Sequence, residues 1–170
     1  AGKVANTGLV EVPMGTALRD LIETIGGGVP DGKAFKAVQI GGPSGGCLPD
    51  AQLDVAIDYD ALDDAGAMMG SGGMVILDED NCMVETARYF LDFTQRESCG
   101  KCTFCRIGTH HMLRLLTDIC EGRGTEAHLT QLEQLAADVR EGSLCSLGKT
   151  APNPVLTTLR FFRDEYETHI

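Results

Sequence analysis

Three cysteines at two-residue gaps, followed by a fourth much later, constrain this sequence more than any other feature. Cys99, Cys102 and Cys105 lie in the segment ESCGKCTFCR, and Cys145 lies in SLCSLG. One loop with this spacing can present three thiolates to a single cubane, and a remote cysteine can close the fourth corner. We name these four residues the site cysteines. Their pattern predicts a [4Fe–4S] cluster bound through four thiolates.

Zinc is the main alternative, because four thiolates also form closed tetrahedral zinc sites. Structural zinc modules more often use two separated C-x2-C pairs, whereas here one loop supplies three ligands, so the spacing favours the cluster. Disulfides are a further alternative. Seven cysteines are an odd number, and the N-terminal segment AGKVANTG lacks the layout of a targeting peptide, so we expect a cytoplasmic protein with reduced thiols.

Composition excludes several classes of function. The net charge of -11 argues against nucleic-acid binding, which needs clustered Lys and Arg to neutralise phosphates. With 5% aromatic residues and no Trp, the chain also lacks the stacking platforms of single-strand binders. Its apolar stretches are short and interrupted by charge, so no membrane span is expected. The acidity indicates solubility.

The first part of the chain has short β-like runs around one helix. Residues 9–13 (LVEVP) and 36–40 (KAVQI) are expected strands, and residues 53–59 alternate like a half-buried edge or hairpin strand. Between them, residues 18–25 (LRDLIETI) predict a helix capped by Thr16. We therefore expect a small α+β unit in which the helix packs on the sheet.

Glycine-rich segments connect these elements. In GGPSGGCLP we weigh a phosphate-binding loop against an irregular turn and favour the turn. Residues 27–33 nearly spell a P-loop, but Ala34 replaces the hydroxyl that binds magnesium. The chain has no G-x-G-x-x-G segment and hence no dinucleotide-binding unit of its own. The segment at 70–73 (GSGG) is expected to be a hinge.

From about residue 80 the apolar residues recur with helical period. Expected helices run from Asn81 or Cys82 to Gln95, from 105 to 121, from Thr125 onward and from Asn153 onward. Short connections between them predict a four-helix bundle with all site cysteines at one end. The second helix would then point its N-terminal N–H groups at an anionic cluster.

Other chemistry-bearing residues receive structural interpretations. Lys101, Arg106 and Lys149 add positive charge near the site cysteines, either as part of its electrostatics or as solvated loop charge. Cys47, Cys82 and Cys120 are interpreted as small buried residues. The adjacent His110 and His111 point in different directions on a helix, so they form no joint metal site. No carboxylate lies beside an evident nucleophile, and we predict no catalytic residue.

The segments discussed above resemble a known family. ESCGKCTFCRIGT, GSGGMVILDEDNCMVETARYFLDFTQ and SLCSLGKTAPNPVLTTLRFFRDEY resemble the C-terminal bundle of the flavin-binding, NADH-oxidising subunit of respiratory complex I and its relatives in NAD(P)-linked hydrogenases and formate dehydrogenases. The stretch from LVEVP to GGCLP resembles the β-grasp (SLBB) domain of the same subunit. The segment TAPNPVLTTLRFFRDEYETHI is most similar to the hydrogenase-linked branch. Phe104 departs from the family, where Pro is common.

The resemblance implies an α+β protein with a β-grasp (ubiquitin-like) domain over 1–60, a linker over 61–80 and a four-helix [4Fe–4S] domain over 81–170. It implies that the site cysteines hold a cluster that relays electrons from FMN, itself reduced by NAD(P)H on a domain that these residues do not include. Implied partners are that flavin domain, a [2Fe–2S] thioredoxin-like subunit and a hydrogenase-type catalytic subunit. The rival interpretation is a binding module in which zinc only staples the bundle. The chain starts without Met, which supports a third interpretation, a fragment that functions only when its missing flavin domain is supplied.

Overall fold

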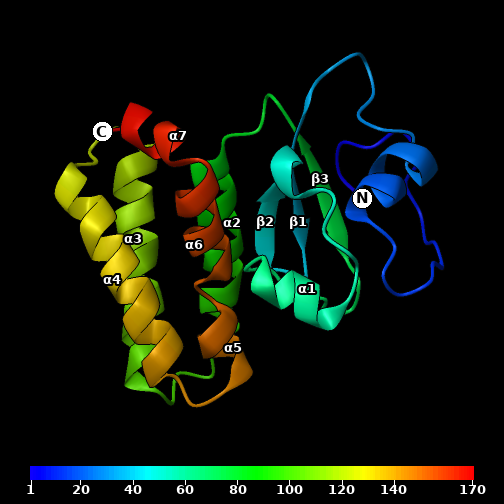
Figure 1. Cartoon of the computed structure of the whole chain (residues 1–170). Coiled ribbons are helices and arrows are strands. Elements are labelled where there is room, and N and C mark those ends of the chain that lie inside the picture. Colours follow the sequence, from blue (N-terminus) through cyan, green and yellow to red (C-terminus); the bar gives the residue numbers. More distant parts are fainter. The chain divides into compact units, whose positions relative to one another are not determined.

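The chain divides into two compact units. The computed structural model describes residues 1–170, and its units are Ala1–Asn81 and Cys82–Ile170. The first unit holds a small sheet with short helices, and the second is entirely helical (Figure 1). This α+β composition confirms the expected fold class. None of the helices combines the length and the apolar character that crossing a membrane requires.

Three antiparallel strands form the sheet of the first unit. Strands β1 (Phe35–Ile40), β2 (Gly46–Pro49) and β3 (Met74–Asp78) lie in the order β2-β1-β3. In the central strand, Val38 pairs with Leu48 on one side and with Ile76 on the other. Because β1 is covered by a neighbour at each edge and by side chains on its faces, the residues Ala37, Val38 and Ile40 are fully buried.

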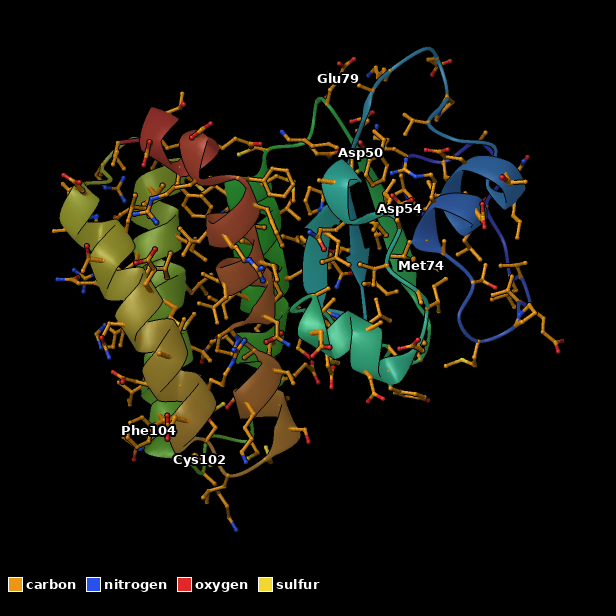
Figure 2. All side chains as sticks on the ribbon, viewed as in Figure 1. Asp50, Asp54, Met74, Glu79, Cys102 and Phe104 are labelled. Carbon is orange, nitrogen blue, oxygen red and sulfur yellow. The ribbon has the colours of Figure 1, made fainter.

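The helices of this unit are short: η1 (Asp20–Ile25), η2 (Asp50–Gln52) and α1 (Tyr59–Asp64). The first of these extends the helical turn that begins at Leu18, as the sequence predicted. On its exposed side, Arg19 forms ion pairs with Glu23, Asp50 and Asp54; Figure 2 labels the last two. These contacts tie η1 to the turn that follows β2.

Two predicted strands and one predicted cap are wrong. Residues 9–13 form no strand, and Leu9 and Val10 face solvent. In 53–59 the one β-bridge joins Ala56 to Ala17. Helix α1 begins at Tyr59, because the Asp58 carboxylate caps it by accepting a hydrogen bond from the Ala61 N–H at 2.7 Å. Thr16 donates to the Pro13 carbonyl instead of capping a helix.

The linker prediction for 61–80 is also wrong. This stretch contains most of α1 and the whole of β3, whose pairing with β1 makes it part of the first unit. The glycine run at 70–73 leads into β3, and Gly70 packs so closely on Gly41 that a side chain on Gly70 would meet the Gly41 carbonyl oxygen at 2.9 Å. Likewise the second half of the predicted glycine-rich turn is β2. The short, glycine-rich β2 shows no strand-like alternation of its own, and β3 was missed because its partner, β1, is distant in sequence.

Four long helical segments build the second unit, as predicted. They are α2 (Met83–Arg96), α3 (Thr109–Cys120, preceded without a break by η3, Phe104–Gly108), α4 (Glu126–Gly142) and α6 (Asn153–Phe161). The shorter α5 (Ser146–Thr150) and α7 (Arg163–Thr168) precede and follow α6.

Apolar side chains at helical spacing fill the centre of this bundle. Leu91, Met112, Leu116 and Leu132 are fully buried there. Tyr166 is buried too, and its hydroxyl lies 2.7 Å from the Thr158 Oγ1, which satisfies the polar atom of each. The core holds the helix ends in place, and the loops that carry the site cysteines lie at one of those ends.

Candidate metal centre

The loop between α2 and η3 carries Cys99 and Cys102. It turns at Gly100, whose φ of +73° favours glycine. The Gly100 N–H donates to the Ser98 Oγ at 3.3 Å, and the Arg106 guanidinium donates to the Gly100 carbonyl. The loop is thus fastened on both sides of its turn, which fixes where the two thiols lie.

Cys105 lies one step deeper, in η3. Cys105 is only 5% exposed, whereas Cys99 and Cys145 are exposed and Cys102 is half-buried. The Cys105 carbonyl accepts a hydrogen bond from the Thr109 Oγ1 at 2.6 Å, and its Sγ lies 3.3 Å from the Ser98 Oγ. Helical geometry therefore places this thiol, with a hydroxyl beside its sulfur.

The fourth site cysteine, Cys145, lies much further along the sequence than the other three. Cys145 directly precedes α5, and its carbonyl accepts from the Lys149 N–H at 3.1 Å. Within α5, Gly148 is buried against Cys105: a side-chain carbon on Gly148 would lie 2.5 Å from the Ser143 Oγ and 3.1 Å from the Cys105 Cβ. Only a residue without a side chain lets α5 approach η3 this closely.

Packing against α4 holds η3 itself. A side-chain carbon on Gly108 would lie 2.2 Å from the Val139 Cγ2, and one on Gly142 would lie 2.4 Å from the Phe104 ring. Phe104 therefore covers Gly142 while half of the phenylalanine stays exposed. Figure 2 shows Phe104 and Cys102 at the same end of the bundle.

The site cysteines line one cavity of about 100 Å³, together with Glu97, Ser98 and Leu147. A cavity that holds one water needs only about 10–15 Å³ by the same measure, so this one has room for a group of several atoms. Nowhere do three or more His, Cys, Asp or Glu side chains gather closely enough to hold a single metal ion. The Ser143 Oγ is buried beside Gly148 without a hydrogen-bond partner. Four soft sulfur donors around a cavity of this size fit a thiolate-bound iron–sulfur cluster.

The positive side chains near the cavity have different environments. Arg106 bonds to the loop backbone and thereby holds the loop's shape. Lys101 and Lys149 are exposed.

Ser98 and Leu147 line the cavity but were not predicted as site residues from the sequence, although Ser98 directly precedes Cys99. No spacing rule indicates that its hydroxyl turns toward the sulfur of Cys105.

The remaining candidates lie away from the cavity. Cys47 is fully buried in β2, and burial raises the pKa of its thiol to about 12. His110 and His111 are exposed on α3, and their ring centroids are 6.1 Å apart. Cys82 and Cys120 were predicted to be core residues, and this prediction is wrong. Both are half-buried and pack at the edge of the helical core.

Two family models match the chain. The model of the NADH-ubiquinone oxidoreductase-F iron-sulfur binding region matches residues 85–169, which is half of the chain and includes every site cysteine. The chain belongs to this family. The SLBB domain model matches residues 1–48. Membership in the oxidoreductase-F iron–sulfur family means that the second unit is a [4Fe–4S]-binding region.

Relatives of this family match the chain over its full length. NADP-reducing hydrogenase subunit HndC of Solidesulfovibrio fructosivorans is 56% identical over 170 residues, which are 35% of that relative. An F-type subunit of NADH-quinone oxidoreductase in Rhizobium meliloti (strain 1021) is 41% identical, and the chain covers 40% of it. Both relatives are subunits of oxidoreductases.

A crystal structure of NAD+-reducing [NiFe]-hydrogenase in the H2-reduced state matches with a TM-score of 0.88 and 31% identity, covering all of this chain and 28% of that chain. The chain thus spans only about a third to two fifths of the length of its curated relatives.

Proposed function

We propose that the chain is an electron-relay module of an NAD(P)-linked, multisubunit oxidoreductase. In this proposal Cys99, Cys102, Cys105 and Cys145 bind one [4Fe–4S] cluster. The observation that carries the proposal is the cavity that these four cysteines line together, with room for several atoms. The family match over the second unit supports it independently.

A cluster of this kind accepts and releases one electron at a time, at a potential set by its surroundings. The residues of this chain supply those surroundings. The Ser98 Oγ lies 3.3 Å from the Cys105 Sγ. With Cys105 bound to iron as a thiolate, this hydroxyl would donate a hydrogen bond to the sulfur and offset its negative charge. Cys105 anchors the inner side of the cavity, and Leu147 keeps one wall apolar.

The outer side of the site is open to a partner. Cys99 and Cys145 are exposed, so two of the four sulfurs lie at the surface. Phe104, Ile107 and Leu144, which neighbour the site cysteines in sequence, also expose large apolar side chains. Exposed apolar groups around a redox site are typical of a docking surface for another protein.

We further propose the electron donor and acceptors. Reduced FMN, regenerated by NAD(P)H, would deliver electrons from a flavin domain outside these 170 residues, because the chain has no dinucleotide-binding segment. A [2Fe–2S] thioredoxin-like subunit and a hydrogenase-type catalytic subunit would exchange electrons with the module. The similarity to HndC, a subunit of an NADP-reducing hydrogenase, and to the NAD+-reducing [NiFe]-hydrogenase supports the hydrogenase-linked branch. We propose a cytoplasmic location, where a reducing environment keeps the site thiols available for metal.

Metal and sulfide analysis of protein purified without oxygen tests this proposal against the zinc-stapled binding module. The relay requires about four irons and four sulfides per chain and a paramagnetic signal after reduction with dithionite. One zinc per chain, no sulfide and no signal would overturn it. The protein should be prepared in the same way with and without added iron and sulfide, so that cluster loss during purification is recognised.

A further inference from the structure

The two segments that carry the site cysteines are basic, although the chain as a whole is acidic. The chain has 25 acidic and 14 basic residues. Residues 98–108 and 143–150 nevertheless contain no Asp or Glu, and their basic residues are Lys101, Arg106 and Lys149. Positive charge is therefore concentrated around the cavity that the site cysteines line.

Two of these basic side chains are available to a partner. Lys101 lies between Cys99 and Cys102, and Lys149 lies one helical turn beyond Cys145, whose carbonyl accepts the Lys149 N–H. Both lysines are exposed, and neither ammonium group has a hydrogen-bond or ion-pair partner within the chain. Their charges are thus held beside the site cysteines without being used to hold the fold together.

Exposed apolar side chains are interspersed with these charges. Phe104, Ile107 and Leu144 all face solvent within or beside the same two segments. Glu97 is the single acidic residue that lines the cavity. Exposed apolar groups mixed with unpaired charges of one sign are typical of a surface that binds another protein. We name Lys101, Arg106 and Lys149, together with these three apolar residues, the basic face.

We propose that the basic face docks a partner protein that presents acidic side chains around its own redox centre. The inference rests on the proposed electron relay, because only a relay requires a second redox centre here. Opposite charges would steer the partner toward Cys99 and Cys145, the two exposed site cysteines, and the apolar groups would exclude water from the contact. A second copy of this chain does not fit, because two basic faces repel each other.

The alternative is that the basic side chains only offset the negative charge of a thiolate-bound cluster. Arg106 suits that role, because its guanidinium is fastened to the Gly100 carbonyl in the cysteine loop. Lys101 and Lys149 suit it less, since solvent and salt screen the charge of an exposed ammonium group. A docked protein removes that screening, so these two lysines contribute most when a partner covers them.

Binding of two redox proteins of opposite charge tests the inference. The full chain, purified without oxygen, is titrated in a calorimeter with an acidic plant-type [2Fe–2S] ferredoxin and, separately, with a basic cytochrome c. The net charge of -11 alone predicts that the cytochrome binds and the ferredoxin is repelled. The basic face predicts that the ferredoxin binds, about tenfold more weakly when the salt rises from about 0.05 M to about 0.5 M. No ferredoxin binding at low salt would overturn the inference.

Matched charge reversals locate the contact. Lys101→Glu and Lys149→Glu should each weaken ferredoxin binding about tenfold. Arg114→Glu makes the same change of charge on an exposed position of α3, about two helical turns beyond Arg106, and should change the affinity less than about twofold. Equal losses in the three variants would overturn the inference, because net charge would then govern binding. A DNA duplex that binds as tightly as the ferredoxin would also overturn it, since the face would then recognise phosphates.

Metal and sulfide analysis of the same samples separates this inference from the relay on which it rests. A chain that contains one zinc and no sulfide, yet binds the ferredoxin through Lys101 and Lys149, would contradict the relay and support the basic face as a docking surface. A chain with about four irons and four sulfides that does not bind the ferredoxin would leave the relay intact and overturn the docking inference.

Discussion

The Ser98 Oγ lies 3.3 Å from the Cys105 Sγ, so the only buried site cysteine has a hydroxyl beside its sulfur. The same Ser98 Oγ accepts the Gly100 N–H, which leaves its hydroxyl proton free to point at the sulfur. Through this single side chain the turn of the cysteine loop and the inner thiol are positioned together.

Replacing Ser98 with Ala should lower the reduction potential of the proposed cluster without emptying the site. A hydrogen bond to a thiolate stabilises the more negative, reduced state, and its loss of about 1 kcal/mol corresponds to roughly 40 mV for one electron. Redox titration followed by paramagnetic resonance measures the shift. Ser98→Thr keeps the hydroxyl and serves as the control. An unchanged potential in Ser98→Ala at full iron content would show that Ser98 does not tune the cluster.

Replacing Gly148 with Ala should destabilise the site end of the bundle by about 1–3 kcal/mol, the usual cost of overpacking. The added carbon would lie 2.5 Å from the Ser143 Oγ and 2.6 Å from the Ser143 Cβ. Urea unfolding measures the loss. The double variant Ser143→Gly with Gly148→Ala removes the clash and should recover most of the stability. If the double variant is no more stable than the single one, the close approach of Ser143 to Gly148 is not what requires glycine.

Truncating Leu116 to Ala should cost about 2–5 kcal/mol, because this side chain is fully buried among the helices and leaves a cavity. Truncating Leu144, which is 84% exposed, should change the free energy of unfolding by less than about 0.5 kcal/mol. Chemical denaturation of both variants under the same conditions makes the comparison. Equal losses would contradict the packing described for the second unit.

The buried Cys47 thiol should make the stability of the protein depend on pH in the alkaline range. Burial raises the pKa of its thiol from 9.0 to about 12 in the folded protein. The folded state therefore binds the proton more tightly, so this contribution to stability is complete below pH 9 and falls as the pH rises from 9 toward 12. At pH 10 the ionisation of this thiol should have lowered the free energy of unfolding of the wild type by about 1.4 kcal/mol.

Urea unfolding of wild type and Cys47→Ala at pH 8 and pH 10 isolates this contribution. The difference between the two proteins should shift by that amount between the two pH values, since all other titrating groups are shared. A difference that stays constant with pH would mean that the Cys47 thiol ionises in the folded protein as it does when unfolded.

The elements that could be predicted from the sequence are those whose signals are local. Helical periodicity predicted the four long segments of the bundle, and the cysteine spacing predicted which thiols the structure brings to one cavity. Prediction failed where tertiary pairing decides. β3 is short and pairs with a distant strand. Residues 53–59 alternate like a strand, although Asp58 caps a helix that begins at Tyr59.

The finer features of the candidate site could not be predicted for a related reason. The approach of Gly148 to Cys105 and the cover of Phe104 over Gly142 depend on how α5, η3 and α4 cross. No sequence period encodes those crossings. Cys82 and Cys120 were assigned to the core from the apolar faces alone. The contact of Cys82 with His169 could not be predicted, because it joins the start of α2 to the residue after α7.

Iron content across a matched set of cysteine variants tests the central claim most directly. Single serine substitutions at each site cysteine, and alanine substitutions at Cys47 and Cys120, are prepared anaerobically with identical iron and sulfide supply. We expect Cys47→Ala and Cys120→Ala to keep about four irons per chain, while each site-cysteine variant loses or converts the cluster. Loss of iron in Cys47→Ala or Cys120→Ala with the fold intact, or a full cluster in any site-cysteine variant, would contradict the ligand assignment.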